Sequence, residues 1–278
     1  MNTIARNESQ RRFWNDPRFL RDWQDNYERS TRTTMRRLLA AADLQLGERV
    51  VDIGCGPGWP TLAAAIQVGD SGCALGVDIS DELVAVARSR ADRIAAGNAT
   101  FEVLDAQTEP FPGAPFDVAI SRNGLMFFDD PSAAFANLRR QMRTGGRLVF
   151  TCFPQGVSDD TSLGVVMKLA RNYDPADRKE MTRLFGLPWV ARSLGDREAT
   201  RGLLQGAGFG HVRCRAFSYV FTVPPGKAWS PRLLEPLMLS DAERLEAESR
   251  LRAWEEAHTV RGRVRLVVPA LLFSAAAV

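Results

Sequence analysis

The sequence predicts an α/β protein in which a doubly wound, mostly parallel sheet carries helices on both of its faces. Three observations predict this fold class. Seven short apolar runs rich in β-branched residues are separated by helix-like stretches, these stretches are bounded by capping residues and glycines, and the two patterns alternate along the chain. The 278 residues are enough for one large domain or for a domain with an appended lid.

The first elements follow one another in strand and helix order. The run RVVDIG forms the first strand, PTLAAAIQVG forms a short helix, and CALGVDI forms the second strand. Ser80 then caps a helix whose apolar stripe consists of Leu83, Ala87 and Ile94 and which stops at Gly97. This order is the strand–helix–strand unit of a parallel sheet.

The later elements continue the same alternation. TFEVLD and FDVAIS are the third and fourth strands, Asp130 and Pro131 open a helix that ends at Gly145 and Gly146, and RLVFTCF is the fifth strand. A further helix lies around residues 196–206, and HVRCRAFSYVF and RVRLVVPALLF are the last two strands. The sheet therefore has seven strands.

These patterns divide the chain into four segments. They are a helical N-terminal lid at 1–44, an α/β core at 45–153, an inserted cap at 154–194, and a completion of the sheet at 195–278 with a helical excursion around 225–262.

Composition excludes several classes of protein. Hydrophobic residues make up 45% of the chain, and 36 basic residues against 33 acidic ones leave a net charge of +3, which is too balanced for a nucleic-acid partner. The four cysteines lie far apart, so no zinc site is indicated, and they fit a reducing cytoplasm. The N-terminus lacks an apolar signal segment, and the apolar C-terminal run is a buried strand rather than a membrane span.

The stretch VVDIGCGPGWP points to the ligand site. An aspartate at the end of the first strand is followed by Gly54, Gly56 and Gly58, and ligands of open parallel sheets bind at this first strand-to-helix turn. A dinucleotide fingerprint would need a third glycine where Trp59 stands, and no lysine follows as a phosphate-binding Walker loop requires.

The pattern D-x-G-x-G-x-G from Asp52 to Gly58 resembles motif I of class I S-adenosylmethionine-dependent methyltransferases. Later motifs of the small-molecule, quinone-biosynthesis-like branch are resembled, in the same order, by GVDIS, VLDAQ, the stretch from FDVAIS to RLVFTCF, and LLQGAGFGHV. The resemblance covers most of residues 1–220 and implies a sheet whose last strand is antiparallel. It also implies S-adenosyl-L-methionine as cofactor and S-adenosyl-L-homocysteine as product.

The resemblance assigns a role to each motif residue. Asp52 lies near the cofactor ammonium group, Asp78 binds both ribose hydroxyls, Ile79 packs on adenine, and Asp105 with Ala106 receives the adenine amino group. The remaining cofactor-binding residues are Gly54, Cys55, Gly56 and Gly58 in the loop, and Ser121 and Arg122 at the methionine end. Asn123 faces the substrate, at a position where the branch often has an aromatic residue.

No catalytic residue emerges from the sequence, because methyl transfer from a sulfonium is accelerated largely by positioning. Open candidates for a general base are His258, Tyr27, Tyr173, Asp129 and Glu180. No metal is expected. Walls for an apolar acceptor are offered by Trp14, Trp23, Phe127, Phe128, Met167, Phe185 and Trp189.

The leading hypothesis is therefore a cytoplasmic enzyme that methylates an O, N or C atom of a small-molecule acceptor by in-line displacement. The sequence leaves open the acceptor and the oligomeric state, with a homodimer among the options. Two alternatives stand beside it: the same fold used for non-methylating chemistry or as a noncatalytic partner, and, more remotely, an NAD(P)-dependent oxidoreductase.

Overall fold

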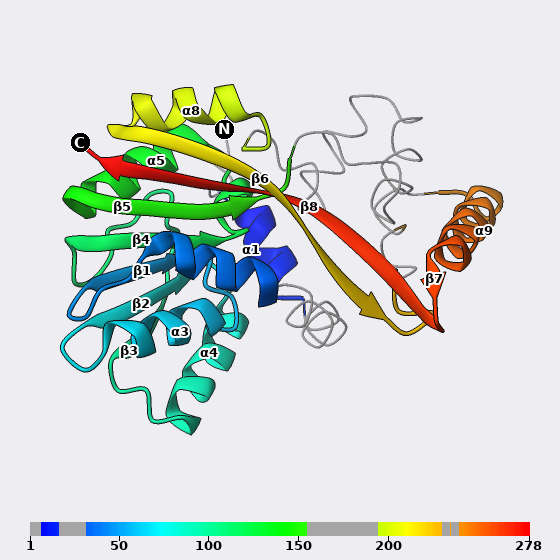
Figure 1. Cartoon of the computed structure of the whole chain (residues 1–278), viewed down its shortest axis with the longest axis horizontal. Helices are drawn as coiled ribbons and strands as arrows, with labels where there is room; N and C mark the ends of the chain where they lie inside the picture. Colours follow the sequence, from blue (N-terminus) through cyan, green and yellow to red (C-terminus); the bar gives the residue numbers. More distant parts are fainter. Residues whose placement is uncertain (1–6, 17–31, 155–193, 230–233, 235–238) are drawn as a thin grey trace.

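A computed structural model of the chain describes residues 7–16, 32–154, 194–229, 234 and 239–278. In this part of the chain, one sheet of eight strands runs through the molecule, with seven strands in the order β3-β2-β1-β4-β5-β8-β6 and β7 paired to β8 (Figure 1). The strands are β1 Arg49–Ile53, β2 Cys73–Asp78, β3 Ala99–Val103, β4 Phe116–Arg122, β5 Met142–Cys152, β6 Phe209–Val223, β7 Thr259–Val260 and β8 Arg263–Ala277.

Strands β1 to β5 pair in parallel, and β8 pairs antiparallel with both β5 and β6. Strand order reverses between β1 and β4, which is where an open parallel sheet forms its ligand crevice. The predicted antiparallel last strand is confirmed. The short β7 adds an eighth strand that the sequence does not indicate.

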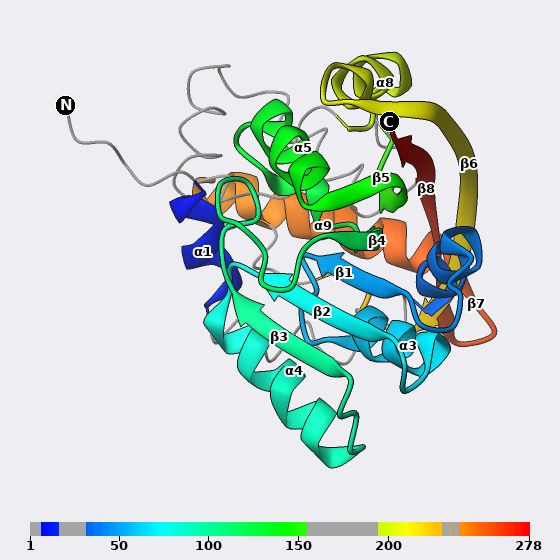
Figure 2. The same cartoon turned by 90° about the vertical axis from the view of Figure 1, so that its left-hand side faces the viewer.

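Helices cover both faces of the sheet (Figure 2). On one face lie α3 Trp59–Val68 and α4 Asp81–Arg93, together with a helical stretch at 32–42. On the other lie α5 Pro131–Arg140 and α8 Arg197–Gly206, preceded by the short 3₁₀ helix η1 Leu125–Phe127. Two buried apolar clusters, one on each face, form the core, so alternate residues of each central strand point into different clusters.

Two capping residues act as the sequence predicts. The Ser80 hydroxyl accepts a hydrogen bond from the backbone N–H of Leu83, and the Asp130 carboxylate accepts one from Ala133, each in the first turn of a helix. These caps fix where α4 and α5 begin, and both helices start just beyond the carboxyl ends of strands.

Two expected boundaries were wrong. The helix after Asp130 ends at Arg140, and the fifth strand already begins at Met142, so Gly145 lies inside a strand. Met142 pairs with Phe116, and a shift of register after Phe116 accommodates the glycine turn. The helix expected to stop at Gly97 ends earlier, at Arg93. Ile94 caps it and is 50% exposed, so Ile94 is not part of the buried stripe.

The C-terminal half extends the sheet beyond its globular part. Strands β6 and β8 form a long antiparallel ribbon, and α9 Asp241–Ala257 lies near its far end (Figure 1). A small apolar cluster of Val223, Trp254, Val264 and Leu266 joins α9 to the ribbon. Helix α9 lies within the segment 225–262, where the sequence predicts a helical excursion. The expected cap at 154–194 lies almost wholly outside the described residues.

Candidate functional site

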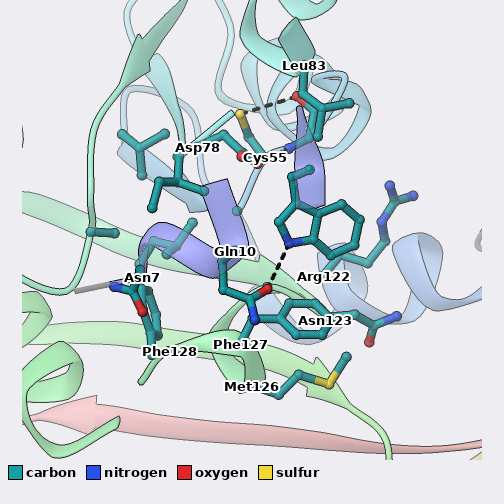
Figure 3. Close-up of a pocket in the computed structure, with 18 of the residues that line it drawn as sticks. Asn7, Gln10, Cys55, Asp78, Leu83, Arg122, Asn123, Met126, Phe127 and Phe128 are labelled. Carbon is teal, nitrogen blue, oxygen red and sulfur yellow. Dashed lines mark hydrogen bonds between the residues drawn. The ribbon is translucent and has the colours of Figure 1, made fainter. Parts of the chain in front are cut away.

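A cavity of about 330 Å³ lies beyond the carboxyl ends of β1, β2, β3 and β4 (Figure 3). Its walls come from the glycine loop after β1, the ends of β2 and β3, the segment from Arg122 to Phe128, and the N-terminal helix α1 Glu8–Trp14. The cavity therefore occupies the crevice that the sheet topology creates. Both carboxylates and aromatic side chains contribute to its wall.

The glycine loop has a backbone that other residues would adopt only with strain. Gly54, Gly56 and Gly58 have φ angles of +67°, +54° and +89°. A Cβ atom on Gly54 would lie 2.9 Å from the Cα atom of Gly124, so this glycine lets two loops approach each other. A Cβ atom on Gly56 would meet nothing within 4 Å, and Gly56 lines the cavity. Gly56 therefore leaves room for a ligand.

Gly58 allows close packing between the glycine loop and two neighbouring elements. It precedes α3, and a Cβ atom there would lie 2.8 Å from Cβ of Ala87 and 3.0 Å from the ring of Phe101. It is not among the residues that line the cavity, whereas Cys55 is. Burial raises the pKa of the Cys55 thiol, so this side chain contributes a neutral surface to the wall.

Asp78 lies at the end of β2 and lines the cavity. One carboxylate oxygen accepts a hydrogen bond of 2.8 Å from the Gly56 N–H, and the other accepts one of 3.0 Å from the Ser80 N–H. Burial raises the pKa of Asp78, and these backbone hydrogen bonds oppose that shift. The carboxylate is therefore held in a fixed orientation by the loop, and Ile79 follows it in the wall.

Asp105 and Ala106 lie just after β3 and also line the cavity. The Asp105 carboxylate accepts hydrogen bonds from the side-chain amide of Asn7 at 2.9 and 3.0 Å and from the backbone N–H of Gln107 at 2.9 Å. Asp105 is 8% exposed. These hydrogen bonds thus hold a buried carboxylate in a fixed orientation just after β3.

Asp52 has a different environment from the one the resemblance implies. It is fully buried, it accepts a hydrogen bond of 2.7 Å from the Thr61 hydroxyl on α3, and it is not among the residues that line the cavity. Burial raises its pKa to about 7, against lowering by Thr61 and by the positive charge of Arg122. Asp52 therefore lies outside the cavity wall, and its charge interacts with that of Arg122, which is part of the wall.

Beyond β4, two of three candidate residues reach the cavity. Arg122 and Asn123 line it, whereas the Ser121 hydroxyl donates a hydrogen bond of 2.7 Å to the carbonyl of Ile53 and serves to join β1 to β4. Asn123 has a φ of +59°, and its side-chain oxygen accepts a hydrogen bond of 2.8 Å from the Thr151 hydroxyl. Its side-chain nitrogen is buried and has no hydrogen-bond partner among the described residues.

The N-terminal helix supplies Trp14, which the sequence offers as an acceptor wall, and two residues that the sequence did not assign to the site, Asn7 and Gln10. Asn7, Gln10 and Trp14 all line the cavity. The indole N–H of Trp14 donates a hydrogen bond of 3.1 Å to Gln10, and its ring meets that of Phe127 edge-on at 5.3 Å (Figure 3). Their spacing of three and four residues places them on one helix face. That spacing is the signal in the sequence from which they could have been found.

The expected acceptor walls are found in part. Trp14, Phe127 and Phe128 line the cavity, and Met126 joins them. The other aromatic or apolar candidates, Trp23, Met167, Phe185 and Trp189, lie outside the described residues, as do the general-base candidates Tyr27, Tyr173 and Glu180.

The remaining base candidates do not face the cavity. His258 ends α9, stacks on Trp254 with ring centroids 4.5 Å apart, and contacts the carbonyl of that residue. Asp129 accepts a hydrogen bond of 2.8 Å from the backbone N–H of Asn7. Within the described part of the chain, no three histidine, cysteine, aspartate or glutamate residues gather as a metal site would require. None of its helices is long and apolar enough to span a bilayer.

Comparison with known proteins places this site in a family. A family model described as a methyltransferase domain matches residues 44–181. The aklanonic acid methyltransferase DauC of Streptomyces sp. (strain C5) is 37% identical over 116 residues, which are 42% of this chain and 53% of that protein. The nocamycin O-methyltransferase of Saccharothrix syringae is 30% identical, with 66% of each chain covered.

The ubiquinone/menaquinone biosynthesis C-methyltransferase UbiE of Azotobacter vinelandii is 32% identical over 183 residues, which are 64% of this chain and 72% of that protein. The chain therefore belongs to the class I S-adenosylmethionine-dependent methyltransferases, as its motifs predict. It spans about half the length of the aklanonic acid methyltransferase that it matches.

Solved structures support the fold alone. The YcgJ protein of Bacillus subtilis superposes with a TM-score of 0.57 at 18% identity, covering 88% of this chain and 97% of that one. The [4+2]-cyclase SpnF superposes with a TM-score of 0.51 at 19% identity, covering 88% and 80%. The fold is thus shared with a protein named for other chemistry, and the reaction has to be argued from the site.

Proposed function

We propose that this protein transfers the methyl group of S-adenosyl-L-methionine to an oxygen, nitrogen or carbon atom of a small, largely apolar acceptor. The observation that carries this proposal is the composition of the cavity wall, which combines the carboxylates of Asp78 and Asp105 with the aromatic side chains of Trp14, Phe127 and Phe128. The first part suits a nucleoside with free hydroxyl and amino donors, and the second suits a ring system.

The charge of the site favours this cofactor over a dinucleotide. Buried acidic residues stand at or just after the carboxyl ends of three neighbouring strands, namely Asp52 in β1, Asp78 in β2 and Asp105 after β3. S-adenosylmethionine brings a sulfonium and an ammonium cation to such a site, whereas a dinucleotide would bring phosphate anions against these carboxylates. The open space at Gly56 permits close approach of the ligand to the backbone, and Arg122 in the wall is a partner for a carboxylate.

When bound, S-adenosylmethionine supplies an electrophilic methyl group: the acceptor atom bonds to the methyl carbon, the carbon–sulfur bond breaks with its electron pair left on sulfur, and the acceptor proton passes to water. The chain contributes position. Asp78 and Asp105 fix the nucleoside end, Arg122 the methionine end, and the aromatic wall excludes water from the acceptor side. Positioning of this kind contributes up to ~7–11 kcal/mol to lowering a barrier.

The acceptor class follows from the same wall and from the relatives. Met126, Phe127 and Phe128 offer flat and adaptable apolar contacts for a multi-ring acceptor. Two relatives are named for aklanonic acid and nocamycin, and another for ubiquinone and menaquinone. Their names favour O- or C-methylation of a quinone-like acceptor or of another small molecule of secondary metabolism. Reduced, dispersed cysteines agree with a cytoplasmic location.

Two experiments test the proposal. Calorimetric titration with S-adenosylhomocysteine and with a reduced nicotinamide dinucleotide is expected to give binding of the first only. Incubation with isotope-labelled methyl donor and a panel of hydroxylated anthraquinones and reduced naphthoquinones, followed by mass spectrometry, is expected to give a labelled product one methyl group heavier. Ser240→Ala, at the cap of the distant α9, serves as a control with full activity.

The outcomes separate the alternatives. Tight binding of S-adenosylhomocysteine with no labelled product across the panel and across cell extracts would favour non-methylating chemistry on the same fold. Binding of the dinucleotide and not of S-adenosylhomocysteine would favour the alternative that the protein is an oxidoreductase. A labelled product that also forms without the protein would refute the proposal.

A further inference from the structure

Asn7 joins two acidic residues that lie far from it in the sequence. Its side-chain nitrogen donates to both carboxylate oxygens of Asp105, at 2.9 and 3.0 Å. Its backbone N–H donates to the carboxylate of Asp129 at 2.8 Å, and its side-chain oxygen accepts from the Asp129 N–H at 2.9 Å. Asn7 is only 2% exposed, so these hydrogen bonds form in a site shielded from water.

The backbone of Asn7 is adapted to this position. Its φ of +60° lies in the left-handed region, which asparagine adopts more readily than most residues. Asn7 immediately precedes α1, and Gln10 and Trp14 of this helix line the cavity with it.

The other end of α1 is fixed at a different strand. The Arg11 guanidinium donates a hydrogen bond of 3.0 Å to the carbonyl of Ile79, and the Ser80 hydroxyl donates one of 3.1 Å to the carbonyl of Trp14. The helix is therefore held at the end of β3 through Asn7 and beyond the end of β2 through Arg11. Between these points Gln10 lies in the wall (Figure 3).

The hydrogen bonds of Asp105 leave a defined place for one more donor. Its Oδ1 atom accepts from Asn7 and from the Gln107 N–H, whereas its Oδ2 atom accepts from Asn7 alone among the described residues. Each carboxylate oxygen has two lone pairs. Asn7 thus turns the carboxylate so that one acceptor position on Oδ2 stays available in a residue that lines the cavity.

We propose that Asn7 is a positioning residue that orients Asp105 toward the amino group of the cofactor base, so that docking of α1 and recognition of that base are one coupled event. The proposal rests on the proposed function, since it takes the cavity as the S-adenosylmethionine site. It assigns to the N-terminal helix a part in choosing an amino-bearing base over an oxo-bearing one. The selectivity between the two bases arises because Asn7 holds the Asp105 carboxylate, the hydrogen-bond acceptor, in place before the ligand binds.

The test compares two ligands that differ at one group. S-adenosylhomocysteine carries the amino group, and S-inosylhomocysteine carries a carbonyl oxygen in its place, which a fixed carboxylate repels. Calorimetry on the full-length wild-type chain is expected to show at least roughly tenfold tighter binding of the adenosyl ligand, as expected for a charge-assisted hydrogen bond.

Two variants of Asn7 keep its backbone conformation accessible. Asn7→Gly removes the side chain without backbone strain, and Asn7→Asp keeps its shape and its acceptor oxygen but replaces the donor by a carboxylate facing Asp105. Both are expected to lose roughly tenfold in affinity for the adenosyl ligand and little for the inosyl ligand, so the ratio of the two falls toward one. Arg12→Ala, on the solvent side of the same helix, is the matched control and keeps the wild-type ratio.

The results distinguish this inference from the proposed function. A wild-type chain that binds neither ligand overturns both. A wild-type chain that prefers the adenosyl ligand, with Asn7 variants that weaken both ligands by the same factor, overturns the inference alone, because that is what a purely structural role would give.

Discussion

Gly56→Ala would add one methyl group to the wall of the cavity. The backbone of Gly56 has a φ of +54°, and the added Cβ atom would meet no protein atom within 4 Å. The methyl group would therefore occupy space that a ligand needs without disturbing the packing of the protein. Stability and ligand affinity are thus expected to respond differently to this substitution.

The cost in stability follows from the backbone alone. Alanine in the left-handed region costs about 1–2 kcal/mol relative to its ordinary conformation. For a chain of this size that corresponds to a decrease of roughly 2–8 °C in Tm. Gly226→Ala is a closely matched control. Gly226 has a φ of +75°, nothing lies within 4 Å of its would-be Cβ atom, and like Gly56 it donates its N–H to a carboxylate.

The cost in affinity is expected for Gly56 only. A methyl group forced into a fitted contact costs about 1–3 kcal/mol, which is roughly 5- to 150-fold in Kd. Isothermal titration with S-adenosylhomocysteine measures the affinity, and thermal unfolding without ligand measures the stability. Equal affinities of Gly56→Ala and the wild-type chain would refute the assignment of this loop to the cofactor. An equal loss of affinity in Gly226→Ala would show that the effect is general destabilisation.

Two further predictions concern the acids of the site. Asp78→Ala is expected to weaken S-adenosylmethionine binding by about 1–3 kcal/mol through lost charge-assisted hydrogen bonds, and unchanged affinity in calorimetry would contradict its role. Asp52 has a pKa of about 7 in the folded chain against 3.8 ordinarily, so the folded state binds the extra proton between these values and stability falls as pH rises from about 4 to about 7. The Asp52→Asn variant lacks this pH-dependent contribution. The difference between its unfolding free energy and that of the wild-type chain should therefore rise with pH over this range, by at most about 1.4 kcal/mol per pH unit. A difference that does not change with pH in urea unfolding would disprove the raised pKa.

Much of the site could be predicted because parallel strands bring their carboxyl ends to one edge of the sheet. Asp78, Asp105 and the glycine loop each follow a strand directly, so their meeting at the cavity follows from strand order. The position of Asp52 was harder to predict from the sequence. It lies on the same strand face as Val50, whose apolar cluster includes residues of α3, and it therefore points toward Thr61. The alternation was visible in the sequence, but not which face borders the cavity.

The sequence by itself determined the order of strands and helices, the caps at Ser80 and Asp130, and the family, because these depend on neighbouring residues and on short motifs. Only the tertiary structure decided that Asn7 binds Asp105, 98 positions away, and that Asn7 and Gln10 line the cavity. A short polar segment carries no local signal for a distant partner, since its hydrogen bonds form only once the sheet has brought that partner within reach.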